Sequence, residues 1–349
     1  MPRRTWGWKM FTGSRTKKGK AMREITYREA VHEAILEEMR RDSRVILMGE
    51  DVGPFGGLTG VTIGLIDEFG ADRVLETPIS ECGFVGAAVG AALKGMRPIL
   101  ELGLADVILV AMDQIVNTAA KMNYFYNGRA SVPLVCRVWS GFRPSGGPQQ
   151  SQSNEAMFAH VPGLKVVMPS TPYDVKGLLK ASIRDDNPVI FFEPKGVYSL
   201  EGPVPDEDYV VELGIAEVKR EGRDVTVIAL GAMVPLALAA ADKLAQDISV
   251  EVVDPRTIRP LDVATLVKSV KKTGRAVIVH EANTTGGVGG EIAAVLADDA
   301  FASLRAPIKR IGAMETPIPV SPALGSAVVP GESNIVDTVR ALIQDTSPS

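Results

Sequence analysis

Short and almost unbroken apolar runs recur along this chain, and segments with helical periodicity separate them. Val45–Met48 and Val189–Phe192 are two such runs. An apolar run without alternation is typical of a strand that is buried on both faces, and a helix between two such strands allows them to run parallel. The pattern therefore predicts an α/β fold with a mostly parallel sheet that helices cover on both faces.

The length of 349 residues favours two domains. Residues 1–21 contain seven Lys and Arg side chains and no acid. We interpret them as a disordered leader, an upstream start or a vector remnant, with a short docking or targeting arm as the alternative. The first domain is expected at 22–200, a polar and proline-containing linker at 201–210, and a smaller α/β domain at 211–345.

Charge and composition exclude several classes of protein. The formal net charge is −4, and the basic residues of 1–21 leave the rest of the chain more acidic still. An acidic body repels phosphate backbones, so we expect no nucleic-acid partner. No apolar run is long enough to cross a bilayer, so we expect no membrane partner. Cys82 and Cys136 cannot form a disulfide framework, which favours a reducing, cytoplasmic location.

Common metal and nucleotide motifs are missing from the sequence. The three histidines, His32, His160 and His280, have no further ligand at the spacing of a zinc site. The sequence also contains no Walker-type phosphate loop. A histidine-dependent metal centre or a P-loop nucleotide site is therefore not expected.

Several segments carry signals for the start of a helix. Thr26-Tyr27-Arg28-Glu29 has the spacing of a capping box, and a helix is expected from Thr26 to about Arg41. Ser80 is expected to cap a helix that runs from Glu81 to about Lys94. A single long helix is expected over about 106–126.

Glu81 occupies an informative position in the first turn of its helix. The helix dipole favours a carboxylate there. Gly83, Gly86 and Gly90 follow on the same helix and would let another backbone or a ligand approach closely. An acid that only stabilises an ordinary buried helix is the simpler alternative, and the local sequence leaves both readings open.

Six motifs in the right order carry a family resemblance over about residues 22–345. They are Gly49-Glu50-Asp51-Val52, Thr77–Glu81, Asp113–Asn117, Pro162–Val167, Pro169–Asp174 followed by Lys176–Leu179, and Asp254–Asp262. Together they resemble the beta subunit of the thiamine-diphosphate-dependent component of 2-oxoacid dehydrogenase complexes.

The resemblance implies a transketolase-like architecture with a pyrimidine-binding domain and a transketolase C-terminal domain. It also implies an α2β2 heterotetramer, in which the alpha subunit holds Mg²⁺ and the diphosphate through a Gly-Asp-Gly motif. This chain contains no Gly-Asp-Gly. We therefore expect the chain alone to supply half of an active site.

The resemblance also assigns roles to individual residues. Glu81 matches the catalytic glutamate that hydrogen-bonds the aminopyrimidine ring of the cofactor. Glu50 and Asp113 match acids of a tunnel between two cofactor sites, although Val110 stands where a further acid would fall. Leu102 and Leu104 stand near the cofactor ring, where related subunits often have phenylalanines. Surface or strand-end acids are the simpler alternative for Glu50 and Asp113.

The chain also differs from the family at the active-site histidine. Gln150 stands in its place, in Gln149-Gln150-Ser151-Gln152. Glutamine can hydrogen-bond but cannot carry a proton at neutral pH, so the role of Gln150 in catalysis is open. A potassium site is also implied by the resemblance, with a helix-ending turn as the alternative. Its expected ligands are main-chain oxygens of Leu134, Ser182 and Ile183, together with Asp185 and Asn187.

The resemblance implies oxidative decarboxylation of pyruvate or a related 2-oxoacid, with transfer to a lipoyl domain of the acyltransferase core. The chain would act only with its alpha subunit. An acetoin-cleaving dehydrogenase is the alternative within the family. A non-catalytic subunit that lost the histidine, or half of a split transketolase-type enzyme, are the alternatives from other classes.

Overall fold

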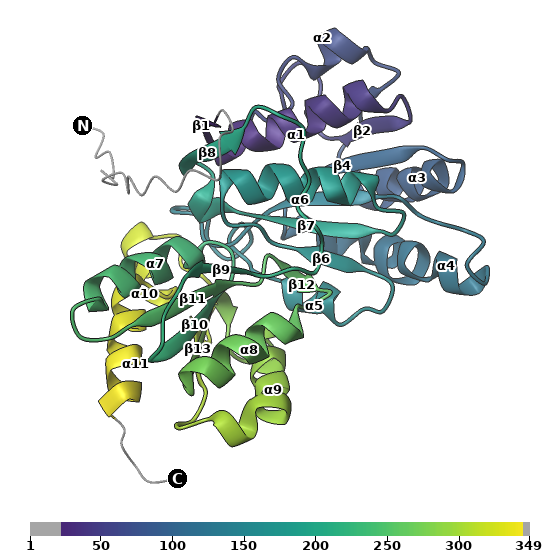
Figure 1. Cartoon of the computed structure of the whole chain (residues 1–349). Helices are drawn as coiled ribbons and strands as arrows, with labels where there is room; N and C mark the ends of the chain where they lie inside the picture. Colours follow the sequence, from purple (N-terminus) through teal and green to yellow (C-terminus); the bar gives the residue numbers. More distant parts are fainter. Residues whose placement is uncertain (1–21, 345–349) are drawn as a thin grey trace, which may run out of the picture.

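The computed structural model describes residues 22–344 and contains two mostly parallel sheets with helices around them (Figure 1). The expectations for residues 1–21 lie outside the described residues. Among the described helices, none combines the length and the apolar character that spanning a membrane requires. The predicted α/β class and mostly parallel pairing are confirmed.

The larger sheet has seven strands, and every neighbouring pair is parallel except β12 with β6. In spatial order it contains β12 (Thr257–Arg259), β6 (Lys165–Val167), β7 (Val189–Pro194), β5 (Val135–Ser140), β4 (Arg97–Leu104), β2 (Val45–Gly49) and β3 (Val74–Glu76).

The smaller sheet has five strands, and only β9 runs antiparallel to its neighbour. Its order is β14 (Lys309–Ala313), β13 (Ala276–Asn283), β10 (Val225–Ala229), β11 (Val250–Asp254) and β9 (Glu217–Arg220). A separate antiparallel pair joins β1 (Met22–Thr26) to β8 (Glu201–Pro205).

We call residues 22–200 the first half of the chain and residues 201–344 the second half. Helices of the first half surround the seven-stranded sheet, and those of the second half surround the five-stranded sheet (Figure 1). The first group is α1 (Tyr27–Arg41), α2 (Leu65–Phe69), α3 (Glu81–Leu93), α4 (Met122–Phe125), α5 (Glu155–Ala159) and α6 (Pro172–Arg184). The second group is α7 (Met233–Leu244), α8 (Val263–Thr273), α9 (Val288–Ala300), α10 (Pro322–Val328) and α11 (Glu332–Gln344).

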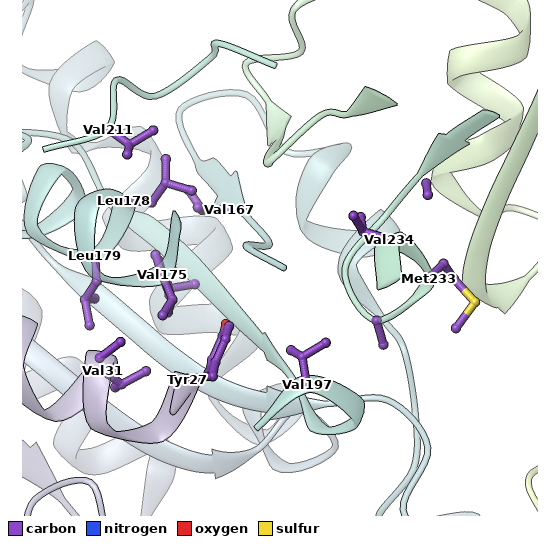
Figure 2. Close-up of a cluster of buried hydrophobic side chains, with 14 of the residues drawn as sticks. Tyr27, Val31, Val167, Val175, Leu178, Leu179, Val197, Val211, Met233 and Val234 are labelled. Atoms are coloured by element: carbon purple, nitrogen blue, oxygen red, sulfur yellow. The ribbon is translucent and has the colours of Figure 1, made fainter. Parts of the chain in front are cut away.

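The core divides between the two faces of the larger sheet, as the unbroken apolar strands predict. In β2, Val45 and Leu47 belong to one apolar cluster and Ile46 and Met48 to another, because successive strand side chains point to opposite faces. Figure 2 shows part of the first cluster, in which Val197 lies between the side chains of α1 and α6 and those at the start of α7. This cluster therefore continues from one half of the chain into the other.

Two helix starts differ in their chemistry. The capping box is confirmed: the Glu29 amide donates to Thr26 Oγ1 at 3.2 Å, and Glu29 Oε2 accepts from the Thr26 amide at 2.7 Å. The helix after Ser80 begins at Glu81 as expected, but the prediction that the Ser80 side chain caps it is wrong. The Ser80 hydroxyl makes no hydrogen bond to its helix and instead donates to the Pro78 carbonyl at 3.3 Å.

The single long helix expected over 106–126 is also wrong. A 3₁₀ segment (Val107–Ala111), a π segment (Asp113–Thr118) and a second 3₁₀ segment (Ala119–Lys121) precede the short α4. Changes between tight and wide turns alter the direction of successive side chains. The 3₁₀ and π segments both pack against α3, so this irregular winding sets which side chains meet that helix.

Two segments of the second half pair with the first half. Residues 201–210, expected to be a linker, begin with strand β8, which pairs with β1. Strand β12, which follows the expected start of the second domain, adds an antiparallel edge to the larger sheet. The two halves are consequently joined by backbone hydrogen bonds as well as by the chain itself.

A buried ion-pair network lies across the three central strands of the larger sheet. Arg137 of β5 is 2% exposed and donates to Glu101 of β4 at 2.9 Å and to Glu193 of β7 at 2.7 Å. Burial raises the pKa of Glu101, and the charge of Arg137 opposes that rise. The guanidinium therefore allows two carboxylates to lie in the core.

Replacing Arg137 by Met should lower the free energy of unfolding by roughly 3–5 kcal/mol, because it leaves two carboxylates buried without their cation. Denaturant unfolding of the purified chain measures this loss. Arg44→Met, which removes an exposed ion pair with Asp42, should cost less than about 1 kcal/mol. Similar losses in the two variants would contradict the importance assigned to the buried network.

Candidate active site

Parallel strands bring their carboxyl ends to one edge of the larger sheet. β2, β4, β5 and β7 are parallel neighbours, so the residues that follow them lie along the same edge. Glu50 follows β2, Asp106 lies just beyond β4, Gly141 follows β5 and Lys195 follows β7. In open α/β sheets, ligands bind beyond the carboxyl ends of the strands.

Glu81 and Glu50 lie close enough to influence each other at this edge. Glu81 is the first residue of α3 and is 8% exposed, and Glu50 is half-buried. Burial raises the pKa of Glu50, and the nearby charges of Glu81 and Asp51 raise it further. Thr77 adds a buried hydroxyl that has no hydrogen-bond partner. This part of the edge therefore brings two carboxyl groups close together, beside a buried polar atom that has no partner.

The structure separates the two leucines expected near the cofactor ring. Leu102 is 4% exposed and belongs to the core on the α3 side of the sheet. Leu104, at the end of β4, remains half-buried and is paired in register with Trp139. Leu104 is therefore the one of the two that a ligand at the carboxyl edge could contact.

Asp113 is exposed and lies in the π segment that packs against α3. Its carboxylate accepts from Asn117 Nδ2 at 2.8 Å and from Gln114 Nε2 at 3.2 Å. Gln114 also donates to the sulfur of Cys82 at 3.7 Å, near the start of α3. Asp113 is thus tied to the helix that carries Glu81, while Val110 is 59% exposed nearby in the chain.

Gln150 lies on the segment 141–152, which we call the carboxyl-edge loop. Gly141 and Gln152 close its base, since the Gly141 amide donates to the Gln152 carbonyl at 3.0 Å. The Gln150 side chain is exposed and accepts from Arg143 Nη1 at 3.3 Å. The loop therefore presents an amide, and not an imidazole, at the edge of the sheet.

Charged side chains that sequence reasoning missed lie beneath the carboxyl-edge loop. Lys195 Nζ donates to the carbonyls of Gly141 at 3.0 Å and Gln150 at 2.8 Å. Burial lowers the pKa of Lys195 to about 8, which Asp106 and Glu281 oppose and Arg143 assists. A lysine directly after a buried parallel strand was the signal in the sequence that could have found it.

Two buried carboxyl groups complete this cluster. Glu281 of β13 accepts a hydrogen bond from the Phe142 amide, and burial raises its pKa. Glu155 at the start of α5 is 2% exposed, and burial together with the charge of Glu281 raises its pKa to about 7. One oxygen of Glu155 has no hydrogen-bond partner. The five-stranded sheet thus contributes a carboxyl group to the edge of the seven-stranded sheet.

The residues expected to hold potassium lie at the end of α6 and directly before the parallel strands β5 and β7, away from the carboxyl edge. Leu134 O accepts from the Val189 amide at 2.8 Å, and Ser182 O accepts from the Asp185 amide at 3.2 Å. Ile183 O accepts from Arg97 Nε at 2.8 Å.

The side chain of Asp185 is also engaged, because it accepts from both the amide and the side chain of Asn187 and pairs with Lys165. Burial opposes the lowered pKa of this carboxyl, and Lys165 and Asn187 cause the lowering. Each carbonyl oxygen has two lone pairs, so the set retains acceptor capacity for a monovalent cation.

Comparison with known proteins matches two family models to consecutive parts of the chain. "Transketolase, pyrimidine binding domain" matches residues 23–200, and "Transketolase, C-terminal domain" matches residues 214–335. The beta subunit of acetoin:2,6-dichlorophenolindophenol oxidoreductase from Bacillus subtilis is 45% identical over 92% of this chain and 98% of that protein. The chain belongs to the transketolase-like beta-subunit family. The predicted resemblance is thereby confirmed.

Other members of the family carry different names at similar identity. The 2-oxoisovalerate dehydrogenase subunit beta of Bacillus subtilis is 45% identical over 93% of this chain and 100% of that protein. The pyruvate dehydrogenase E1 component subunit beta of Rhizobium meliloti is 45% identical over 93% of this chain and 71% of that protein. Family membership implies dependence on thiamine diphosphate.

A solved structure titled "Split gene transketolase, inactive beta4 tetramer" has a TM-score of 0.75 to this chain at 23% identity. The match covers 91% of this chain and 98% of that one. At this level of identity the comparison establishes the fold alone. It confirms the predicted transketolase-like architecture.

Glu155→Gln should weaken the pH dependence of stability between pH 6 and pH 8. Because folding raises the pKa of Glu155 from 4.5 to about 7, its contribution to stability is complete below pH 4.5 and is lost as the pH rises through 7. Glutamine is neutral throughout, so the variant should gain stability relative to the wild type at pH 8.

Thermal melting of both proteins at pH 6 and pH 8 measures the difference. Glu212→Gln, which changes an exposed carboxyl group, should keep the wild-type dependence on pH. An equal change of melting temperature with pH in the wild type and Glu155→Gln would contradict the assignment.

Proposed function

We propose that this chain is the beta subunit of a decarboxylating, lipoyl-acylating 2-oxoacid dehydrogenase component, with pyruvate or a related 2-oxoacid as substrate. The observation that carries the proposal is the pair Glu81 and Glu50 at the carboxyl edge of the larger sheet, in a chain of this family. Homologues named for pyruvate and 2-oxoisovalerate dehydrogenases support the reaction class.

Glu81 would hold the aminopyrimidine end of thiamine diphosphate. Its carboxyl group, at the N-terminus of α3, would share a hydrogen bond and a proton with the ring nitrogen. Glu50 would supply a second carboxyl group, and Leu104 an apolar surface against the ring. Bound thiamine diphosphate supplies the nucleophilic carbon and the electron sink for decarboxylation. A site from which water is excluded strengthens the contact made by Glu81.

The remaining parts of the site would come from an alpha subunit in an α2β2 heterotetramer. The chain lacks a Gly-Asp-Gly motif, so Mg²⁺ and the diphosphate would be held by that partner. The fragment that decarboxylation leaves would then pass to a lipoyl domain of the acyltransferase component. The lipoyl disulfide would take up two electrons in this step, so that the fragment is oxidised to an acyl group on one sulfur and the other sulfur becomes a thiol. Asp113 would line a tunnel between two cofactor sites together with Glu50. The unpaired Cys82 and Cys136 support a cytoplasmic location.

An acetoin dehydrogenase beta subunit is the second candidate function. Relatives named for acetoin oxidation from Bacillus subtilis and Cupriavidus necator are 45% identical, as are the pyruvate and 2-oxoisovalerate relatives. A non-catalytic subunit is the third candidate, because Gln150 cannot transfer a proton. Turnover of pyruvate, 2-oxoisovalerate and acetoin by the reconstituted complex distinguishes the three.

Glu81→Gln should reduce turnover of the complex with its alpha partner at least about 100-fold, because the amide cannot exchange a proton with the cofactor ring. The melting temperature should stay close to that of the wild type. Calorimetry should show thiamine diphosphate binding, in the presence of Mg²⁺, only when the alpha partner is present.

Ser80→Ala is the matched control, since the Ser80 hydroxyl makes no hydrogen bond to α3 and its loss should leave turnover unchanged. Near-normal turnover in Glu81→Gln would exclude the proposed role of the carboxyl group. No cofactor binding even with the alpha partner would favour a non-catalytic subunit.

We also propose a potassium ion at Leu134, Ser182, Ile183, Asp185 and Asn187. Replacing NaCl by KCl at equal ionic strength should raise the melting temperature by at least about 2 °C, because a bound ion stabilises the folded state. Asp185→Ala should abolish this difference between the salts. Asp186→Ala, which removes an exposed neighbouring carboxylate, should retain it. A difference that survives in Asp185→Ala would argue against the site.

A further inference from the structure

The carboxyl-edge loop, residues 141–152, is held by charged groups from three separate elements. Lys195, which follows β7, binds two of its carbonyls. Glu281 of β13 accepts from the Phe142 amide. Asp106, beyond β4, accepts from the side-chain amide of Gln152 at 2.9 Å. Two of these charges therefore come from the first half of the chain, and one comes from the second.

Lys195 makes the contact that bears most directly on Gln150. Its two acceptors, Gly141 O and Gln150 O, lie at opposite ends of the loop, so one ammonium group joins the two ends. Lys195 is 9% exposed, and its Nζ lies 5.4 Å from the centre of the Trp139 ring. A buried charged donor forms a stronger hydrogen bond than a neutral donor at the surface.

The backbone of the loop is adapted to this arrangement. Gly141 has a φ of +89°, and a Cβ at this position would lie 2.5 Å from Glu281 Oε1. A side chain here would therefore meet both backbone strain and a clash with the carboxyl group. The glycine lets Glu281 and Lys195 both contact the same end of the loop.

We propose that Lys195 is a positioning residue that fixes the backbone at Gln150, and so directs the Gln150 amide toward the bound substrate. This inference rests on the proposed function, since it assumes that the carboxyl edge binds a 2-oxoacid or acetoin. The Gln150 side-chain oxygen accepts from Arg143, and its NH₂ group offers donors that suit a carboxylate or carbonyl oxygen of such a substrate. Lys195 itself is turned to the backbone and does not contact the substrate.

The test uses the complex with the alpha partner and the variants Lys195→Met, Gln150→Ala and the double variant. The substrate is whichever of pyruvate, 2-oxoisovalerate and acetoin the wild type turns over fastest, with 2,6-dichlorophenolindophenol as the electron acceptor. Lys195→Met should raise KM at least fivefold, while the Kd of thiamine diphosphate changes less than twofold. Adding Lys195→Met to Gln150→Ala should raise KM less than twofold further, because both changes remove one interaction.

Hydrogen exchange measures the loop independently of turnover. Amides of residues 141–152 should exchange at least tenfold faster in Lys195→Met than in the wild type. Lys180→Met is the matched control: Lys180 is also a buried lysine, but it lies on α6 and forms ion pairs with Glu37 and Asp208. This variant should lower the melting temperature without changing loop exchange or KM.

The outcomes separate the inference from the proposed function. Unchanged exchange in Lys195→Met, or independent effects of Lys195→Met and Gln150→Ala on KM, would overturn the positioning role while leaving the proposed function intact. Faster exchange with unchanged KM would also overturn it. No turnover by the wild-type complex with any of the three substrates would overturn the proposed function and, with it, the role of Lys195.

Discussion

The ion-pair network around Arg137 is the interaction on which the carboxyl edge of the larger sheet depends. Glu101 also accepts from the Leu58 amide at 3.2 Å, and Glu193 accepts from the Tyr198 hydroxyl. The network therefore fixes the glycine-rich loop after β2 and the segment after β7 as well as three strands. Both segments lie beside the proposed site. Moving either of them would leave a buried carboxylate with fewer partners, and such a change is costly.

Ionisable groups with shifted pKa values gather at this same edge. Glu50 faces Glu81, Glu155 faces Glu281, and Lys195 lies beneath the carboxyl-edge loop. Burial is the first cause of each shift, and nearby charges modify it. Such groups concentrate where proteins perform chemistry, because burial disfavours the charged form of each group and makes electrostatic contacts stronger than they are in water. This supports the proposed location of the site.

The two halves of the chain act together in this arrangement. β12 extends the larger sheet (Figure 1), and one apolar cluster continues into α7 (Figure 2). Glu281 of β13 accepts a hydrogen bond from the carboxyl-edge loop. The second half therefore helps to shape the edge that carries Glu81 and Gln150. A site built from both halves, with further parts expected from an alpha subunit, explains why local motifs describe it only in part.

The sequence alone predicted those features of the structure that depend on residues close together in the chain. Unbroken apolar runs predicted buried parallel strands, Thr26 and Glu29 predicted a capping box, and six ordered motifs identified the family. The roles given to Glu81, Gln150 and Asp185 remain proposals. Tertiary structure decided features that the local sequence does not show. The segment expected to form one helix over 106–126 winds as 3₁₀ and π segments beside α3, and Leu102 lies in the core while Leu104 stays half-buried. Lys195 and Glu281 contact the same loop because parallel strands end at one edge and the second sheet packs against that edge. The two residues are far apart along the chain, so the sequence alone does not predict that they come together.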